Sequence, residues 1–429
     1  MSWDTAFSFQ PQLAFRSMPL KRRHFLAAAV ASLVGSETLA AKKKPTAPAS
    51  RNAKPIRKAA ARKPAATPAK PPAPVVHTAD EPIIEHPPQG SSASRLPPVK
   101  APEPPDEWRT YEVTTTVQLK RALGPTRLWL PLPLNQDMLF QRTLGHAWKG
   151  NPESASLRRL PDGDLEVFYC EWNSGIEPHI RLTTTVTTAD RHFDVTKRTV
   201  APEREDILRR NLQASRLIPN DDEAHRLGER IVGRIKDPVA QVKALYDWVI
   251  ENAIYDPALP GVGGGDIRRQ LDARQYGGRS ADINGLLVAL CRGIGIPARC
   301  VYGLRVGPSR LFRSLGLSDD RATAAQHVRA EFYVPGYGWI PVDPSDVRRV
   351  IALEGISDRD SKLAALRKIL FGVWEMNWIA FNVGSDVPLP GSRGKVPFLV
   401  HPQLEDADGS HDGRLPDRVP YTITARRVD

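Results

Sequence analysis

The sequence predicts an α+β protein in which an amino-terminal antiparallel β-sandwich-like domain precedes helices packed on an antiparallel sheet. Two observations predict this fold class. Short alternating segments rich in β-branched residues fill residues 108–200. Beyond residue 201, apolar residues recur at helical spacing before strand-like segments return. A chain of 429 residues also leaves room for about two to three domains at roughly 150 residues each.

Residues 1–41 have the composition of a signal peptide. Lys21, Arg22 and Arg23 precede an apolar run over residues 27–34, and small residues follow. The paired arginines resemble the twin-arginine export signal of bacteria. We therefore predict that the chain is periplasmic. The alternatives are a basic start with a chance arginine pair, and translation that begins at Met18.

Residues 42–107 are predicted to be a disordered linker. Residues 42–105 hold sixteen of the forty prolines and hardly an aromatic residue, so this segment cannot bury enough apolar surface to fold. Ten basic and no acidic residues lie between Lys42 and Lys70. This basic linker is either a contact for anionic envelope polymer or a solvated spacer.

The net charge of +12 comes from the amino-terminal tail. Residues 1–70 hold fourteen basic and two acidic residues, so the rest of the chain holds 46 of each sign. A formally neutral body argues against nucleic acid as a partner. The longest apolar run, residues 25–34, falls short of the roughly 20 residues that span a bilayer. We predict no transmembrane span in the mature chain.

The sequence contains no recognisable cofactor or metal motif. No zinc-protease, Walker or dinucleotide-binding pattern occurs. Three cysteines, Cys170, Cys291 and Cys300, exclude a disulfide scaffold and a paired zinc spacing. We therefore predict no cofactor and no metal, and a fold that depends on a packed core.

Residues 108–200 form the predicted amino-terminal β domain. Alternation of apolar and polar residues and the turn signal at residues 161–163 favour short antiparallel strands. No cluster of catalytic residue types occurs in this region. The predicted strands are Tyr111–Val117, Arg127–Pro133, Leu165–Tyr169 and Ile180–Thr188.

Two helices are predicted in the following core. Asp237 and Pro238 are an N-cap and a first helical residue. A second helix follows the pair Gly277 and Gly278, and its apolar residues recur at helical spacing from Leu286 to Ile294. Ser280 is thereby placed in the first turn of a buried helix.

Three strands are predicted after the second helix, at Cys300–Val306, His327–Val334 and Trp339–Asp343. The turn Pro335–Gly338 joins the last two. His327 opens one strand and Asp343 closes the next, so a hairpin would bring these two side chains together.

These residues resemble the transglutaminase-like superfamily, whose core shares the papain-like thiol arrangement. The family pattern is a glycine-rich loop with Cys at a helix start, followed by several short motifs. This sequence supplies those motifs in order, as Gly295–Arg299, His327, Glu331–Tyr333, Gly338–Trp339 and Asp343–Pro344. The resemblance covers roughly residues 237–350 and implies a transglutaminase-like (papain-like) core over residues 201–384. Residues 129–133 also resemble the amino-terminal β region of bacterial envelope members.

Ser280 stands where the family has its nucleophilic cysteine. In the family, a thiolate attacks an amide carbonyl and the histidine protonates the leaving amine. A serine hydroxyl stays protonated there, so His327 would have to remove its proton during the attack. Impaired or absent acyl transfer is therefore one reading. A serine-dependent hydrolase using Ser280, His327 and Asp343 is the other.

The remaining candidates have a structural and a functional reading. Tyr276 is an oxyanion donor or an aromatic wall, and Trp339 is a substrate-binding or a core residue. Asp282 and Asn284 are explained by helix capping. No cysteine replaces the nucleophile: Cys291 lies about 16 Å further along the helix, Cys300 is expected in the core, and Cys170 lies in the β region.

The carboxy-terminal end is predicted to cover the core. Asp358–Leu370 has helical periodicity, and residues 385–429 form an extension packed on the core, with a final strand at Tyr421–Ala425.

Three functions remain open. One is an exported protein with impaired acyl transfer that binds peptide or protein amides, including peptidoglycan-related ones. The second is a serine-dependent amidase or peptidase, and the third is a non-enzymatic envelope interaction module.

Overall fold

The computed structural model describes residues 107–429, apart from residues 121, 123, 136–137, 161–164, 194–199, 358 and 416. All of them belong to one compact unit, Ser91–Asp429. The predicted signal peptide and, but for its last residue, the predicted linker lie outside the described residues, as do the predicted turn at 161–163 and the first residue of the helix predicted from Asp358.

Two antiparallel sheets make up the β region that follows. One has the strand order β19-β1-β6-β3 and the other the order β18-β17-β2-β5-β4. Apolar side chains of both sheets, among them Val117, Ile180, Leu128 and Phe168, form one buried cluster, as expected of a sandwich. The amino-terminal strands are β1 (Arg109–Gln118), β2 (Thr126–Pro131), β3 (Gln141–Gly150), β4 (Ser154–Arg159), β5 (Glu166–Trp172) and β6 (His179–Thr188).

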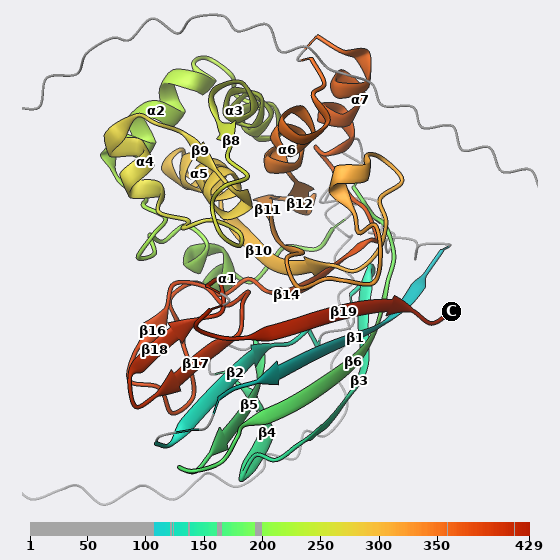
Figure 1. Ribbon diagram of the computed structural model, residues 1–429. Coiled ribbons are helices and arrows are strands. Elements are labelled where there is room, and N and C mark those ends of the chain that lie inside the picture. Colours follow the sequence, from blue (N-terminus) through green and yellow to red (C-terminus); the bar gives the residue numbers. More distant parts are fainter. Residues whose placement is uncertain are drawn as a thin grey trace, which may run out of the picture. The chain divides into compact units, whose positions relative to one another are not determined.

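The carboxy-terminal segment completes both sheets. Strand β19 (Tyr421–Arg427) pairs with β1 along its length, as Figure 1 shows. Strand β17 (Gln403–Asp406) pairs with β2, and with β18 (Gly409–Asp412). The segment predicted to pack on the core therefore also closes the β region, because pairing with β1 and β2 satisfies backbone groups that would otherwise face solvent.

Another antiparallel sheet, separate from the two in the β region, organises the core. Its order is β12-β11-β10-β14, which confirms the three strands predicted there. The bounds are β10 (Ala298–Arg305), β11 (Gln326–Val334), β12 (Gly338–Val342) and β14 (Trp378–Asn382). Alternate residues of β11, from Val328 to Val334, share one buried cluster with the helix that starts at Ser280. Helices on an antiparallel sheet confirm the predicted α+β class.

Helix α5 (Ser280–Gly293) is the central helix of the core. Every residue from Ser280 to Arg292 is buried, as expected for a helix that is apolar on nearly all sides. Figure 1 shows α5 against β10 and β11, with α2, α3 and α4 on its other side. The predicted helix after Asp237 is confirmed as α3 (Pro238–Asn252), and the Asp237 carboxylate accepts the Ala240 N–H at 2.8 Å.

Further helices frame the core. Helix α6 begins directly after Asp343, where only the end of a strand was predicted. Helix α7 falls within the helix predicted from Asp358. The helices are α1 (Glu205–Arg210), α2 (Asp222–Val232), α4 (Ile267–Ala273), α6 (Pro344–Glu354), α7 (Ser361–Ile369) and the short η1 (Arg313–Leu315). The remaining short strands are β7 (Arg191–His192), β8 (Ile254–Tyr255), β9 (Gly277–Gly278), β13 (Val373–Trp374), β15 (Val387–Pro388) and β16 (Lys395–Val396).

No helix among the described residues has both the length and the apolar character needed to cross a bilayer.

Candidate active site

The glycine pair before α5 positions Ser280. Gly277 and Gly278 have φ of +133° and +127°, a region that only glycine adopts without strain. A Cβ on Gly277 would lie 2.1 Å from the Ile254 carbonyl oxygen, because β9 runs parallel to β8 there. The two glycines therefore let the chain pass close to β8 and turn directly into the first residue of α5.

Asp282 holds this turn in place. Its carboxylate accepts the Arg279 N–H at 2.8 Å and the Gly265 N–H at 2.7 Å, which ties the helix start to the preceding loop. Burial raises the pKa of Asp282, and the backbone hydrogen bonds oppose this rise. The capping role predicted for Asp282 is confirmed.

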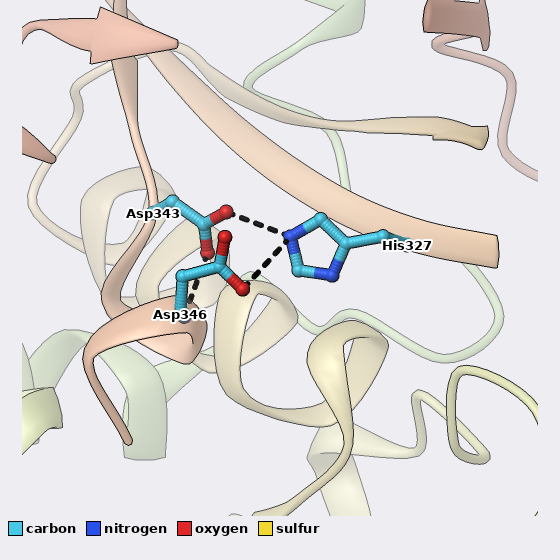
Figure 2. A group of neighbouring side chains, drawn as sticks. All are labelled: His327, Asp343 and Asp346. Carbon is cyan, nitrogen blue, oxygen red and sulfur yellow. Dashed lines mark hydrogen bonds and ion pairs between the residues drawn. The ribbon is translucent and has the colours of Figure 1, made fainter. Parts of the chain in front are cut away.

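His327 and Asp343 meet as the predicted hairpin requires. His327 Nε2 lies 2.7 Å from Asp343 Oδ2, and Figure 2 shows the imidazole edge facing this carboxylate. The other oxygen of Asp343 accepts hydrogen bonds from Ser345 Oγ at 2.7 Å and from the Asp346 N–H at 3.1 Å. The carboxylate is thus held in place as the N-cap of α6 while it orients the ring of His327.

Asp346 is a second carboxylate at His327 and was not among the predicted site residues. Its Oδ1 lies 3.4 Å from His327 Nε2 (Figure 2) and 2.5 Å from Arg305 Nη2. The signal was available in the sequence, because Asp346 is the third residue after the N-cap Asp343. His327, Asp343 and Asp346 could together hold a cation, but Arg305 already supplies positive charge to that carboxylate.

Ser280 meets the same strand through the backbone. Its Oγ accepts the N–H of Val328, the residue after His327, at 3.1 Å. In the described part of the chain, Ser280 makes no hydrogen bond with the His327 ring. The helix start, the histidine strand and the aspartate strand therefore converge, as predicted, but the hydroxyl is bound to the backbone of β11 rather than to the imidazole.

Asn284 joins the three elements. It lies one helical turn after Ser280, and its Nδ2 donates to the Val328 carbonyl at 2.6 Å and to Asp343 Oδ1 at 3.1 Å. The prediction that Asn284 serves only in helix capping is wrong, because its amide bonds to β11 and to Asp343. A polar residue four positions after the candidate nucleophile was the available signal.

Burial of His327 favours the neutral form of its imidazole. Burial lowers the pKa of His327 well below its usual value, and the positive charge of Arg305 acts in the same direction, while Asp346 opposes it. Because Nε2 faces carboxylate oxygens, this nitrogen carries the proton. The lone pair is then on Nδ1, which is the tautomer that a general base requires.

The site is enclosed. Ser280 is 4% exposed and His327 is 3% exposed. Trp378 covers part of the strand that carries the histidine, and its Nε1 donates to the His327 carbonyl at 3.2 Å. Burial strengthens electrostatic interactions among these groups because little water screens them.

Tyr276 and Trp339 lie in other surroundings. The Tyr276 ring packs edge-on against Trp248 of α3 at 5.1 Å. Trp339 is covered by the Arg299 guanidinium at 3.9 Å and donates to Glu203 at 3.0 Å. The substrate-binding roles proposed for the two residues remain predictions.

The three cysteines are free and buried. Burial raises the pKa of Cys300 to about 12 and also raises the pKa values of Cys170 and Cys291. A thiol that stays protonated is a poor nucleophile, which agrees with the expectation that none of them replaces the family cysteine.

Comparisons with known proteins place this geometry in a family. Residues 225–344 match the model of the transglutaminase-like superfamily. An uncharacterized protein of Haemophilus influenzae is 30% identical over 299 residues, which cover 65% of this chain and 80% of that protein.

Two crystal structures resemble parts of the chain. One, from Cytophaga hutchinsonii, is named as a candidate cysteine protease; it shares 17% identity at a TM-score of 0.44 and covers 75% of this chain and 98% of its own. The other is the periplasmic domain of TgpA from Pseudomonas aeruginosa, with 17% identity, a TM-score of 0.31, and coverage of 60% of this chain and 92% of its own.

The family match runs from α2 to the first residue of α6. It contains the start of α5, the strand of His327 and the end of the strand before Asp343. The chain belongs to the transglutaminase-like superfamily.

Proposed function

We propose that this protein binds peptide or protein amides in a transglutaminase-like site whose nucleophile position holds Ser280, and that its acyl transfer is impaired. The observation that carries the proposal is the hydrogen bonding of Ser280. Its Oγ accepts the Val328 N–H, while the pair of His327 and Asp343 stands intact at 2.7 Å. Asp343 still orients His327 as a base, but Ser280 is bound to the backbone of β11 and is not activated by that base.

The chemistry of oxygen explains the impairment. A cysteine near a positive charge at a helix start can have its pKa lowered from about 8.5 to as little as roughly 3.5. A serine hydroxyl is not ionised under these conditions, so attack requires proton removal in the same step. Donation from Val328 to Oγ also occupies a lone pair and lowers the nucleophilicity of that oxygen.

A serine-dependent amidase or peptidase is the second candidate. The observation in its favour is His327 Nδ1, which makes no hydrogen bond within the described residues and carries the lone pair. In this reaction, Ser280 Oγ bonds to the amide carbon as its proton passes to Nδ1. The C–N bond then breaks, the proton goes to the leaving amine, and water hydrolyses the acyl ester.

Substitution Ser280→Cys tests the proposal. We expect the variant to gain iodoacetamide-sensitive amidase or amine-transfer activity, because His327 and Asp343 are already placed for a thiolate. The double variant S280C/H327Q is the matched control and should lose the gain. Wild-type protein controls for the three buried thiols. If folded S280C protein reacts with iodoacetamide no faster than free cysteine, the site is not a retained thiol-enzyme site.

A fluorophosphonate probe separates the two candidates. Labelling of wild-type protein at Ser280, lost in S280A, would favour the serine hydrolase and contradict impaired acyl transfer. We expect folded wild-type protein to remain unlabelled while it still binds peptide.

We also propose that the protein acts in the periplasm after twin-arginine export. Arg22 and Arg23 before an apolar run support this location. Replacement of both by lysine should retain the protein in the cytoplasm, as measured by fractionation. The basic linker between Lys42 and Lys70 is proposed to contact anionic envelope polymer; its deletion should release the protein in a salt-dependent way, and unchanged fractionation would contradict this contact.

A further inference from the structure

Two arginines flank the candidate site without a carboxylate partner. Arg279 immediately precedes Ser280 in the chain. Arg349 lies on α6 one helical turn after Asp346, the carboxylate beside His327. Among the carboxylates that the structure describes, none forms an ion pair with either guanidinium. Each arginine instead donates to uncharged oxygens.

Both guanidinium groups converge on Tyr255. Arg349 Nη1 donates to the Tyr255 hydroxyl at 2.6 Å, and the central carbon of this guanidinium lies 5.6 Å from the ring centroid. The corresponding distance for Arg279 is 5.5 Å. Tyr255 is on β8, which pairs with the two glycines that lead into Ser280. One guanidinium from the segment before Ser280 and one from the helix after Asp343 therefore lie against the same ring.

The other hydrogen bonds of these arginines leave their charge uncompensated. Arg279 Nη1 donates to the carbonyls of Pro257 and Leu259 at 3.1 and 3.0 Å. Arg349 Nε donates to the Ser314 carbonyl at 2.7 Å. Backbone carbonyls satisfy the N–H donors, but they carry no formal negative charge.

The neighbouring charges do not compensate for this. Arg305 is paired with Asp346 at 2.5 Å, and Arg329 lies 3.7 Å from Asp343. Burial, followed by the nearby Arg305, lowers the pKa of Arg349, and Tyr255 and Asp346 oppose this shift. In family members a thiolate would add a negative charge at position 280, whereas the serine hydroxyl adds none.

We propose that this site binds peptides that carry a carboxylate beside the bound amide, with Arg279 and Arg349 as its ligands and Tyr255 as the wall between them. This inference rests on the proposed function. Guanidinium groups bind carboxylates through charge-assisted, often paired hydrogen bonds. Ile254 and Leu259, which are exposed beside these residues, offer apolar contact to the rest of a peptide. The carboxylate belongs either to an acidic side chain or to a chain terminus.

Three dansylated tetrapeptides test the inference by fluorescence anisotropy. The first, dansyl-Ala-Gln-Gly-Glu-amide, has a side-chain carboxylate. The second, dansyl-Ala-Gln-Gly-Gln-amide, is neutral, and the third is the same peptide with a free carboxy terminus. We expect one of the carboxylate peptides to bind wild-type protein about tenfold or more tightly than the neutral peptide. The preferred peptide identifies the source of the carboxylate.

Variants assign the preference to the two arginines. Arg279→Gln should reduce the carboxylate preference, measured as the ratio of the dissociation constants of the neutral and the carboxylate peptide, to about twofold or less. Arg349→Gln should reduce the preference in the same way. Arg349→Lys keeps the charge and should retain part of the preference. The pair of variants therefore separates the loss of charge from a disturbance of the fold through the lost hydrogen bond to Tyr255. Arg209→Gln, at an exposed position on α1, is the matched control.

The outcomes separate this inference from the proposed function. If wild-type protein binds all three peptides equally, the carboxylate site is wrong and peptide binding stands. If no peptide binds, both are wrong. If the preference persists unchanged in R279Q and in both Arg349 variants, other groups bind the carboxylate and the assignment is wrong.

Discussion

The two ends of strand β11 hold buried charges that are used differently. At one end, Glu331 lies between Arg191 and Arg299, with each carboxylate oxygen 2.6 Å from one guanidinium. The Arg299 guanidinium also covers the ring of Trp339 at 3.9 Å. Both carboxylate oxygens of Glu331 thus have a guanidinium partner, and the cluster links three separate segments of the chain. We interpret it as structural.

At the other end, around His327, the ion-pair distances vary, and several of the described polar atoms make no hydrogen bond. His327 Nε2 lies 2.7 Å from Asp343 and 3.4 Å from Asp346, and Arg329 lies 3.7 Å from Asp343. The described residues include three buried atoms in this neighbourhood without a hydrogen bond, namely Asn284 Oδ1, Arg329 Nε and His401 Nε2. Buried polar groups are nearly always paired. The exceptions therefore mark the end of the strand that has capacity for a ligand.

The largest effect on stability is expected at the end of β11 that holds Glu331. Glu331→Ala would leave two partly buried guanidinium groups without their carboxylate, and we expect the free energy of unfolding to fall by about 3–5 kcal/mol. Urea denaturation followed by tryptophan fluorescence measures it. Glu205→Ala, which removes an exposed partner of Arg209, is the control and should cost about 0–1 kcal/mol. A loss below about 1 kcal/mol for E331A would contradict the structural role.

A smaller loss is expected at the glycine turn before Ser280. In Gly278→Ala the new Cβ would lie 2.4 Å from Asp282 Oδ2, at a φ of +127°. We expect a destabilisation of about 1–3 kcal/mol, together with weaker peptide binding because Ser280 shifts. Gly295→Ala is the control, since it also has positive φ but no atom lies within 4 Å of the new Cβ. Equal losses in the two variants would show that the contact with Asp282 is unimportant.

Acidification should act on the histidine end of β11 before it acts on Glu331. Burial lowers the pKa of His401 to about 4; its Nδ1 lies 3.3 Å from the Tyr421 hydroxyl, which in turn accepts from Gln326, the residue before His327. The unfolded chain binds a proton near pH 6.5 and the folded chain does not, so stability falls as the pH drops from about 6.5 to about 4. The pKa of Glu331 is lowered, so its contribution to the free energy of unfolding is lost only as the pH falls below the unfolded pKa near 4.3.

The change from pH 7 to pH 5.5 should cost about 1.2 kcal/mol per buried neutral histidine. His401→Asn should remove its share of this slope. His192→Asn, at a side chain that is 68% exposed, should leave the slope unchanged. Denaturant titrations at a series of pH values measure both, and an identical slope in wild type and H401N would contradict the burial of a neutral histidine.

Periodicity and turn chemistry predicted the elements that carry the site. The glycine pair, the apolar spacing after Ser280 and the Asp343–Pro344 pair are local signals, and they correctly predicted the start of α5 and the neighbouring strands. The same signals missed α6, because Asp343 was taken only as a strand end although it also caps a helix. The signals placed Ser280, His327 and Asp343 on three adjacent elements without giving the contacts between them.

Local sequence patterns could not predict the contacts between segments that lie far apart in the chain. Asn284 looked like a residue of the first helical turn, yet its amide bonds to β11 and to Asp343. The pairing of β19 with β1 joins residues about 300 positions apart, and no local pattern specifies such a partner. The convergence of Arg279 and Arg349 on Tyr255 likewise joins three segments.

The sequence by itself determined the fold class, the family resemblance and the presence of serine at the nucleophile position, because these depend on residue identity and local spacing. Only the tertiary structure decided that Ser280 bonds to the Val328 backbone, that the ring of His327 is buried beside two carboxylates, and that two arginines without an ion pair to any described carboxylate face one tyrosine. Hydrogen-bond partners and pKa values depend on distances and burial, which arise only when separate segments pack together.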